Sequence, residues 1–179
     1  MARSKPAAKD AIALLKADHR QVEEWFEQFE KARDDERKQE LATKICNALK
    51  VHTTIEEEIF YPAFLEASDD VDIHHEAEIE HRGAKNLISE IEACSPDDEY
   101  FEPTVKVLSE MIKHHVKEEE KAGGMFSVAR ESNMDLVALG EELATRKAEL
   151  ESGDSEDPDM PPPGVGERGN VDRLMKETR

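Results

Sequence analysis

The sequence predicts an all-α protein: an antiparallel up-down-up-down four-helix bundle with an additional C-terminal helix and a disordered tail. Three observations support this fold class. Charged residues make up 37% of the 179 residues and aromatic residues only 5%, and the helix formers Ala, Leu, Glu and Lys occur throughout, as is typical of helical proteins. Apolar residues recur at helical spacing in four long stretches. Short breaks separate these stretches, which favours antiparallel neighbours.

The first two predicted helices each carry a histidine on the apolar side. The first covers residues 10–32, capped by its opening aspartate, and His19 lies on its apolar stripe. The second begins at the break Asp34-Asp35 and reaches about Ala67. Pro62 lies within its last turns, where a proline is expected to kink or loosen the helix.

The third and fourth predicted helices complete the bundle. Ser68-Asp69-Asp70 opens the third, which ends near Cys94-Ser95-Pro96. Asp97 or Asp98 begins the fourth, and Gly123-Gly124 stops it. The long apolar stripes of both helices indicate that each faces a common core.

The remainder of the chain divides into two parts. A short segment, Met125 to Glu131, is followed by an amphipathic helix from Asp135 to about Glu151, which is expected to lie against the bundle rather than in its core. We therefore predict one domain over residues 10–151. Residues 152–179 are an acidic segment rich in Pro and Gly, which predicts a flexible tail.

Charge and composition exclude several classes of partner. The formal net charge of −19 argues against nucleic acid and anionic membrane surfaces, because both require clusters of Lys and Arg. No apolar run is long enough to span a membrane, and no apolar signal segment follows the start. The simplest interpretation is a cytoplasmic protein, whose two cysteines are reduced thiols.

Six polar residues lie on the inward faces of the four long helices: His19, His52, Glu56, His81, His115 and Glu119. Counted from the turns at 1.5 Å per residue, the four histidines fall at a similar depth. Two pairs repeat a four-residue His-to-Glu spacing on helices that run the same way, so the pairs face each other.

Carboxylates in an apolar interior are costly unless their charge is compensated. Two divalent metal ions bridged by Glu56 and Glu119 would compensate it. A ligand set of nitrogen and oxygen without thiolate suits iron or manganese and, less specifically, zinc, and carboxylates that bridge helices hold the metal pair in diiron bundles.

Several neighbouring residues compete for these roles. His114 lies on a rival stripe, but the stripe through His115 is more continuous. The pair His74-His75 lies near the start of the third helix and is expected to be exposed, and the pair Glu57-Glu58 is expected to be solvated. Tyr61 is expected to pack in the core or to hydrogen-bond near the site.

Four segments together resemble the hemerythrin-like HHE cation-binding domains of bacteria over about residues 10–150. They are Lys16-Ala-Asp-His19-Arg20, His52-Thr-Thr-Ile-Glu56-Glu57-Glu58-Ile-Phe-Tyr61-Pro62, Glu80-His81, and His114-His115-Val-Lys-Glu118-Glu119-Glu120. The resemblance implies a four-helix bundle with an oxo- or hydroxo-bridged nonhaem diiron centre, so two iron ions are expected and manganese or zinc are the less favoured metals. The ligands it implies are His19, His52, Glu56, His81, His115 and Glu119.

The chain departs from the oxygen-carrying hemerythrins at two positions. Those proteins place two histidines four apart on the third helix, whereas Ala77 occupies the partner position of His81 here. They also carry an aspartate where Glu119 stands. More carboxylates and fewer imidazoles favour ferric iron, which argues against reversible oxygen carriage. Glu23 and Glu78 are candidate additional ligands for the vacant position, and water is the alternative.

The resemblance implies a metal-binding diiron protein that binds or reacts with dioxygen, nitric oxide or peroxide, in oxidative or nitrosative stress. A diiron oxidase or catalase-like activity is compatible with it. The alternative is an iron or oxygen sensor, or a metal-storage module, with no turnover; a purely structural helical adaptor is a third hypothesis. Hydrolase, kinase and dehydrogenase functions are excluded because the chain lacks a Ser/His/Asp set, a P-loop and a dinucleotide glycine pattern.

Overall fold

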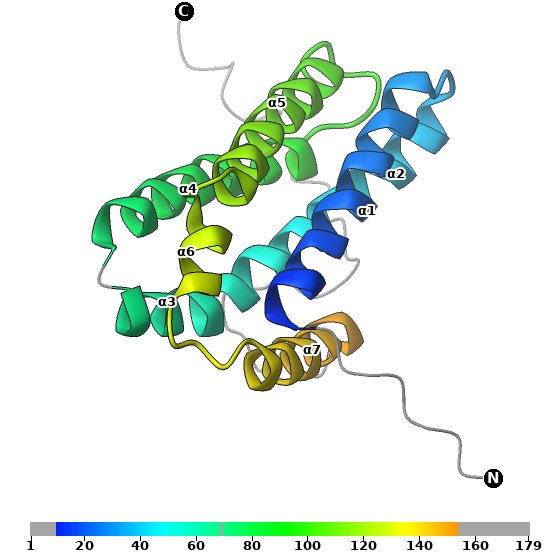
Figure 1. Cartoon of the computed structure of the whole chain (residues 1–179). Coiled ribbons are helices and arrows are strands. Elements are labelled where there is room, and N and C mark those ends of the chain that lie inside the picture. The colour runs from blue at the N-terminus through cyan, green and yellow to red at the C-terminus, as the bar shows by residue number, and fades with distance from the viewer. Residues whose placement is uncertain (1–9, 69, 154–179) are drawn as a thin grey trace, which may run out of the picture.

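The computed structural model describes residues 10–68 and 70–153 of the chain. Its elements are α1 (Ala11–Lys31), α2 (Asp35–Ile55), the π-helical turn η1 (Glu56–Phe60), α3 (Tyr61–Ser68), α4 (Val71–Ala93), α5 (Phe101–Glu120), α6 (Met125–Glu131) and α7 (Leu136–Ser152). The long helices α1, α2, α4 and α5 form the bundle, while α3, α6 and α7 lie towards one end of it (Figure 1). The predicted fold class is confirmed. The predicted tail, residues 152–179, lies outside the described residues apart from its first two, of which Ser152 ends α7.

Aspartate side chains begin four of the helices. The Oδ1 atoms of Asp10, Asp34, Asp70 and Asp135 each accept a hydrogen bond from the backbone N–H three residues later. Each bond satisfies a donor that has no partner within the first turn of the helix. The sequence signals for these four helix starts are thereby confirmed.

The start of α5 differs from the prediction. Residues 96–100 form turns, and the helix begins only at Phe101. The Oδ1 atom of Asp98 accepts a hydrogen bond from the N–H of Tyr100 at 2.9 Å, two residues later, so this aspartate caps a turn instead of the helix. Asp and Asn commonly close such turns, and sequence alone does not separate this use from helix capping.

The helix α2 continues through η1 into α3 without a break. At η1 the backbone N–H of Tyr61 bonds to the carbonyl of Glu56, five residues earlier, instead of four. Pro62 follows directly and has no N–H to donate, so the predicted loosening takes the form of one wide turn. As a result Glu56 and Tyr61 both face the interior, with exposed fractions of 0% and 1%.

Two glycines fold the chain back after α5. Gly123 has a φ of 76°, the left-handed region that favours glycine. A Cβ on Gly124 would lie only 2.2 Å from the carbonyl oxygen of Glu118, so only glycine fits there. This tight turn places Met125 and Phe126, at the start of α6, in the buried core.

The buried apolar residues form two clusters, and the six polar residues singled out from the sequence lie between them along the helices. The first cluster, which we call the closed end, is built only from the four long helices: Val22, Phe26, Phe29, Leu41, Ala42, Ile45, Cys46, Leu49, Ala84, Ile88, Ile91, Phe101, Val105, Leu108, Ile112 and Val116. The second, the composite end, also draws on the short elements: Ala11, Ile12, Leu15, Val51, Ile55, Phe60, Tyr61, Phe64, Ala77, Met125, Phe126, Ala129, Leu143 and Leu150.

The last helix takes a larger part in the core than predicted. α7 contributes Leu143 and Leu150, which are 0% and 3% exposed, to the composite end. The expectation that it only lies against the bundle is therefore wrong, because its apolar stripe closes the core where the four long helices leave it open. None of the described helices combines the length and apolar character needed to cross a membrane.

Candidate metal centre

The structure brings the six inward polar residues together in one buried layer. Their exposed fractions range from 0% for Glu56 to 4% for three of the histidines. They come from α1, α2, η1, α4 and α5. Of the two adjacent histidines on α5, His115 faces the layer, whereas the side chain of His114 is 60% exposed.

The four imidazoles form two pairs. The Nε2 atoms of His19 and His52 lie 3.1 Å apart, and those of His81 and His115 lie 3.3 Å apart. Each of the two glutamates spans both pairs. Glu56 Oε2 lies 3.3 Å from Nε2 of His52 and 3.4 Å from Nε2 of His81.

Glu119 makes the complementary pair of contacts. Its Oε2 atom lies 3.4 Å from Nε2 of His19 and 3.5 Å from Nε2 of His115. Each carboxylate therefore faces one imidazole of each pair, and four ring nitrogens converge on two carboxylates.

The outer ring nitrogens explain why the Nε2 atoms point inward with free lone pairs. Three of the rings place Nδ1 within 3.0 Å of a carboxylate oxygen: His19 faces Glu120 at 2.9 Å, His81 faces Glu57 at 3.0 Å and His115 faces Glu80 at 2.8 Å. An ionised carboxylate can only accept, so Nδ1 must carry a proton and Nε2 is the nitrogen that can offer its lone pair to a metal. This is the tautomer that binds metal, with the carboxylate orienting the ring.

The fourth ring, that of His52, also places Nδ1 near a carboxylate, but at a longer distance. Nδ1 of His52 lies 3.5 Å from Oδ2 of Asp18, beyond a good hydrogen bond. The other oxygen of Asp18 accepts from Lys147 of α7 at 2.5 Å. Asp18 is thus turned partly towards the surface lysine.

Basic side chains hold the other outer carboxylates from outside. Arg20 donates to both oxygens of Glu120, at 2.7 and 2.6 Å. Lys85 donates to both oxygens of Glu57, at 2.8 and 2.6 Å. Nε2 of His114 lies 3.2 Å from Glu80. Each of these three imidazoles is therefore held by a carboxylate, and that carboxylate is held in turn by a basic side chain nearer the surface.

These outer carboxylates were not identified as functional from the sequence. Glu57 was expected to be solvated, and it is instead half-buried against His81. A sequence signal did exist, because each outer carboxylate is the immediate neighbour of an inward residue, as in the segments Asp18-His19, Glu56-Glu57, Glu80-His81 and Glu119-Glu120. Each one serves a histidine on another helix, however, and the pairing depends on how the helices face each other.

The residues present fit a pair of cations. Both oxygens of Glu56 and Oε2 of Glu119 are buried without a hydrogen-bond partner among the described residues. Two nitrogens bound to one ion at about 2.1 Å lie about 3 Å apart when they meet near a right angle, which matches the spacing within each imidazole pair. Two ligand groups share Glu56: one with His19 and His52, the other with His81 and His115.

The protonation equilibria of the layer show the same need for positive charge. Burial raises the pKa of Glu119, and the neighbouring charge of Glu56 raises it further. Burial also acts against ionised Glu56, but His52 and His81 outweigh it and lower the pKa of Glu56. One carboxylate thus resists ionisation beside the other, as expected for two acids that share a buried site. A bound cation would favour the ionised form of both.

The histidines respond in opposite ways. Burial and the nearby His52 lower the pKa of His19 to about 4, which keeps its ring neutral. Burial also disfavours the charged form of His81, but the adjacent carboxylates of Glu56 and Glu57 raise the pKa of His81 to about 9. His81 therefore supplies positive charge in the absence of an ion, and a metal would replace its proton.

Tyr61 lies at the edge of the layer. Its hydroxyl is 3.1 Å from Nε2 of His81 and donates to Oε1 of Glu119 at 3.5 Å. Burial raises the pKa of Tyr61 well above its usual value, with the charge of Glu56 adding to the effect, so the phenol keeps its proton. The expectation that Tyr61 hydrogen-bonds near the site agrees with this geometry.

The two additional ligand candidates do not reach the layer. Glu23 is half-buried and pairs with Arg20 at 2.7 Å. Glu78 is exposed, with its nearest basic atom on His74 at 3.8 Å. Each lies on the outer side of its helix and pairs with a neighbour on that helix, so its role as a ligand stays a prediction.

The pair His74-His75 is only partly exposed. The side chain of His74 is 12% exposed, and its ring packs edge-on against Tyr61 with the centroids 5.5 Å apart. His75 is exposed as predicted. Together with Glu78 they form a third group of possible ligand atoms at the surface of α4.

The fold and the buried layer define a class of protein: a helical bundle that binds metal cations between its helices. Residues 10–123 match the hemerythrin HHE cation binding domain. The match covers more than half of the chain, and the chain therefore belongs to this family.

Two known proteins show how far the likeness extends. A DNA nickase from Nostoc sp. is 28% identical over 120 residues, which is 65% of this chain and 32% of that protein, so the chain spans about a third of its curated relative. A crystal structure of an HHE cation binding domain-containing protein from Mycobacterium kansasii aligns with a TM-score of 0.69 over 80% of this chain and 88% of that one, at 22% identity. The second likeness supports the fold.

Proposed function

We propose that the protein is a nonhaem diiron protein that binds or reacts with a small oxidant, namely dioxygen, nitric oxide or peroxide. One observation supports this most strongly: the Nε2 atoms of four histidines, three of them oriented by carboxylates on Nδ1, converge on two buried glutamates, three of whose four oxygens have no hydrogen-bond partner among the described residues. His19, His52 and Glu56 would hold one iron, and His81, His115 and Glu56 the other, with Glu119 facing both.

The donor set favours iron among the common metals. It consists of imidazole nitrogens and carboxylate oxygens, and the described cysteines, Cys46 and Cys94, belong to or pack against the closed end instead. Bound iron would supply the change of oxidation state and an open position for the small molecule.

The chain's own residues would prepare this chemistry in three ways. The outer carboxylates fix the orientation of the imidazoles, so little reorganisation is needed when metal binds. The apolar clusters keep bulk water from reaching the layer along the helices. Tyr61 holds a proton at the edge of the layer, within reach of His81 and Glu119.

Metal analysis of a matched pair of variants tests the proposal. The wild-type protein, loaded anaerobically with ferrous iron, should retain two irons per chain. Glu56→Gln keeps the shape but removes the shared charge, and it should lose at least half of the iron. Glu58→Gln changes an exposed neighbour in the same turn and should retain both. A wild-type protein with no affinity for ferrous iron, or equal iron content in all three, would contradict the proposal.

The alternative hypothesis, an iron or oxygen sensor or a storage module, predicts a different outcome for turnover. Such a module would bind iron without catalytically consuming peroxide. A centre that reacts with peroxide should instead convert two molecules of hydrogen peroxide into two of water and one of dioxygen in the loaded wild-type protein, and should lose this activity in Glu56→Gln. An electrode measurement separates the two. Nickase activity is not carried over from the Nostoc relative, because the chain spans only 32% of that protein.

A further inference from the structure

The two halves of the buried layer differ in how they are covered. At the His19/His52 half, the ring of Phe126 stacks on His19 with the centroids 5.8 Å apart. A space of about 10 Å³ separates the layer from the closed end, and both imidazole pairs line it. This is about the smallest space that holds one water molecule, and Phe126 covers the ring of His19, so the His19/His52 half is the more enclosed of the two.

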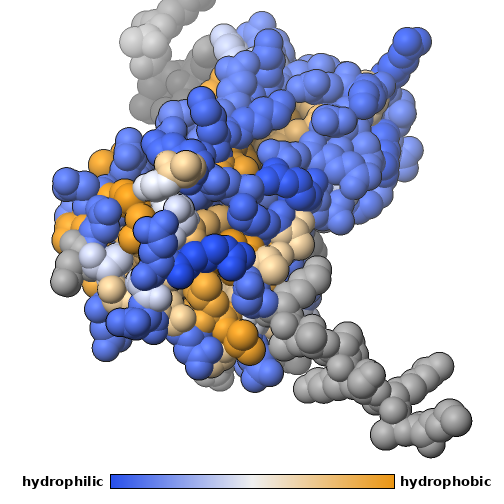
Figure 2. All heavy atoms as spheres, viewed as in Figure 1, coloured by the Kyte–Doolittle hydropathy of each residue, from blue (hydrophilic) through white to orange (hydrophobic). Residues whose placement is uncertain are grey.

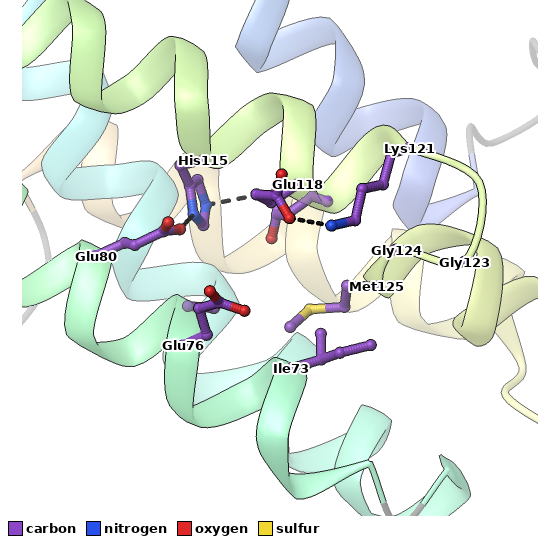
Figure 3. A pocket seen from close by; sticks show the side chains of 11 residues that line it. Ile73, Glu76, Glu80, His115, Glu118, Lys121, Gly123, Gly124 and Met125 are labelled. Atoms are coloured by element: carbon purple, nitrogen blue, oxygen red, sulfur yellow. Dashed lines mark hydrogen bonds and ion pairs between the residues drawn. The ribbon is translucent and has the colours of Figure 1, made fainter.

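The His81/His115 half borders an open cavity of about 110 Å³, which it meets through His115. Figure 3 shows it between α4, α5 and the turn before α6, with His115 on one side and Met125 on the other. Ala77 and Glu119 also line it. The space exists because the side chain of Ala77 ends at Cβ on the face of α4 that is one turn before His81.

The outer part of this cavity is negatively charged. Glu76, Glu80 and Glu118 line it together with one basic residue, Lys121, which is paired with Glu118. Figure 3 shows the ion pair at the rim, with Glu76 across from it. A surface of this sign lowers the local concentration of anions and has little effect on neutral molecules.

We propose that a small uncharged ligand, such as nitric oxide or dioxygen, reaches the metal position held by His81 and His115 through this cavity. The metal position held by His19 and His52 stays covered. This proposal rests on the proposed function, because it requires that both positions hold iron. It adds that the two irons are inequivalent and that the approach discriminates against anions.

A variant that fills the cavity tests the route. Ala77→Leu adds three carbons inside the space, and Ala93→Leu adds the same group at an exposed position on the same helix. Nitric oxide binding to the anaerobic, iron-loaded protein is followed by stopped-flow absorbance, together with the iron content. Ala77→Leu should keep two irons and slow association by about tenfold or more, and Ala93→Leu should match the wild type.

The outcomes separate the two proposals. Rapid nitric oxide binding in Ala77→Leu with two irons present would overturn the route and leave the diiron function intact. A wild-type protein that holds no iron pair would remove both proposals.

A charge variant at the rim of the cavity tests whether the approach discriminates against anions. It also tests the route itself if Ala77→Leu fails to fold or to load iron. Glu76 is exposed, so Glu76→Lys should fold. It should speed azide association with the oxidised protein by about tenfold at low salt, while nitric oxide association with the reduced protein stays unchanged. An azide rate equal to that of the wild type would overturn the proposal, because charge at this rim would then have no influence on the approach.

Discussion

The two ends of the bundle are built on different principles. The closed end uses only α1, α2, α4 and α5, whose apolar stripes meet over several turns. The composite end depends on the shorter elements η1, α3, α6 and α7 as well, and among the described residues α5 adds no apolar side chain to it. Figure 2 shows the same contrast at the surface, because hydrophobic residues gather where α3, α6 and α7 lie, while hydrophilic residues cover most of the rest.

The difference indicates which end depends on the metal. Isolated helices shorter than about 12–15 residues are marginal in water, and α6 has only 7 residues. α3 is the last 8 residues of the helix that continues from α2 through η1. Both elements add their buried side chains to the composite end. We therefore expect the closed end to fold by its own packing and the composite end to be stabilised by bound ions.

The largest effect is expected from a cavity in the closed end. Phe26 is 1% exposed, and Phe26→Ala should lower the free energy of unfolding by about 3–5 kcal/mol, because the lost burial and the residual cavity add. The loss should be the same with and without iron, as measured by urea denaturation. Tyr100→Ala, at a position that is 65% exposed, is the control and should change little. A Phe26→Ala loss that appears only with iron bound would break the comparison.

Removal of the metal should have the next largest effect on the free energy of unfolding, and it should loosen the composite end more than the closed end. At a free iron concentration of 100 times Kd, binding contributes about 2.7 kcal/mol, which chelation removes. Amide hydrogen exchange should then rise first in α3, α6 and the first turn of α1.

The thiol of Cys46 provides the internal control for that experiment. It is buried in the closed end, and burial raises the pKa of Cys46 to about 12. Alkylation of this thiol should therefore remain slow in the chelated protein, even while the composite end exchanges. Equally fast opening of both ends would show that the bundle responds as one unit.

The smallest effect is expected at the ion pair that ties α7 to η1. Arg146 donates to both oxygens of Glu58, at 2.7 and 3.1 Å. Partly exposed pairs contribute about 1 kcal/mol or less, so Arg146→Ala should barely shift the denaturation midpoint but should increase exchange in α7. Arg37→Ala removes a comparable arginine at the closed end and should leave α7 unchanged. A large global loss from Arg146→Ala would mean that α7 is a main support of the fold.

Much of the fold could be predicted because it follows from local signals. Aspartate caps and the 3.6-residue spacing of apolar side chains are read within one helix, and the structure confirms the helices that they indicate. The start of α5 could not be predicted, since Asp98 caps a turn with the same chemistry that would cap a helix. The depth to which α7 is buried depends on an opening between other helices, which no local pattern records.

In the site, too, features within one helix could be predicted, whereas contacts between helices could not. The inward direction of His52 and Glu56 follows from their spacing on one helix, and the structure brings both into the layer. The contacts of Glu57 with His81 and of Glu120 with His19 join different helices. Their formation depends on the rotation of each helix about its axis, which the sequence spacing leaves open.

The wide turn at η1 has a consequence for how the chain tolerates changes of length. In a regular α-helix, residues five apart lie about 140° from each other around the axis, whereas residues four apart are separated by only about 40°. Glu56 and Tyr61 nevertheless face the same side, so the turn absorbs one surplus residue. Deletion of a single residue between them should yield an uninterrupted helix with the phenol still directed at His81. The loss of one residue at this point is thus absorbed locally, without turning the rest of the helix away from the metal layer.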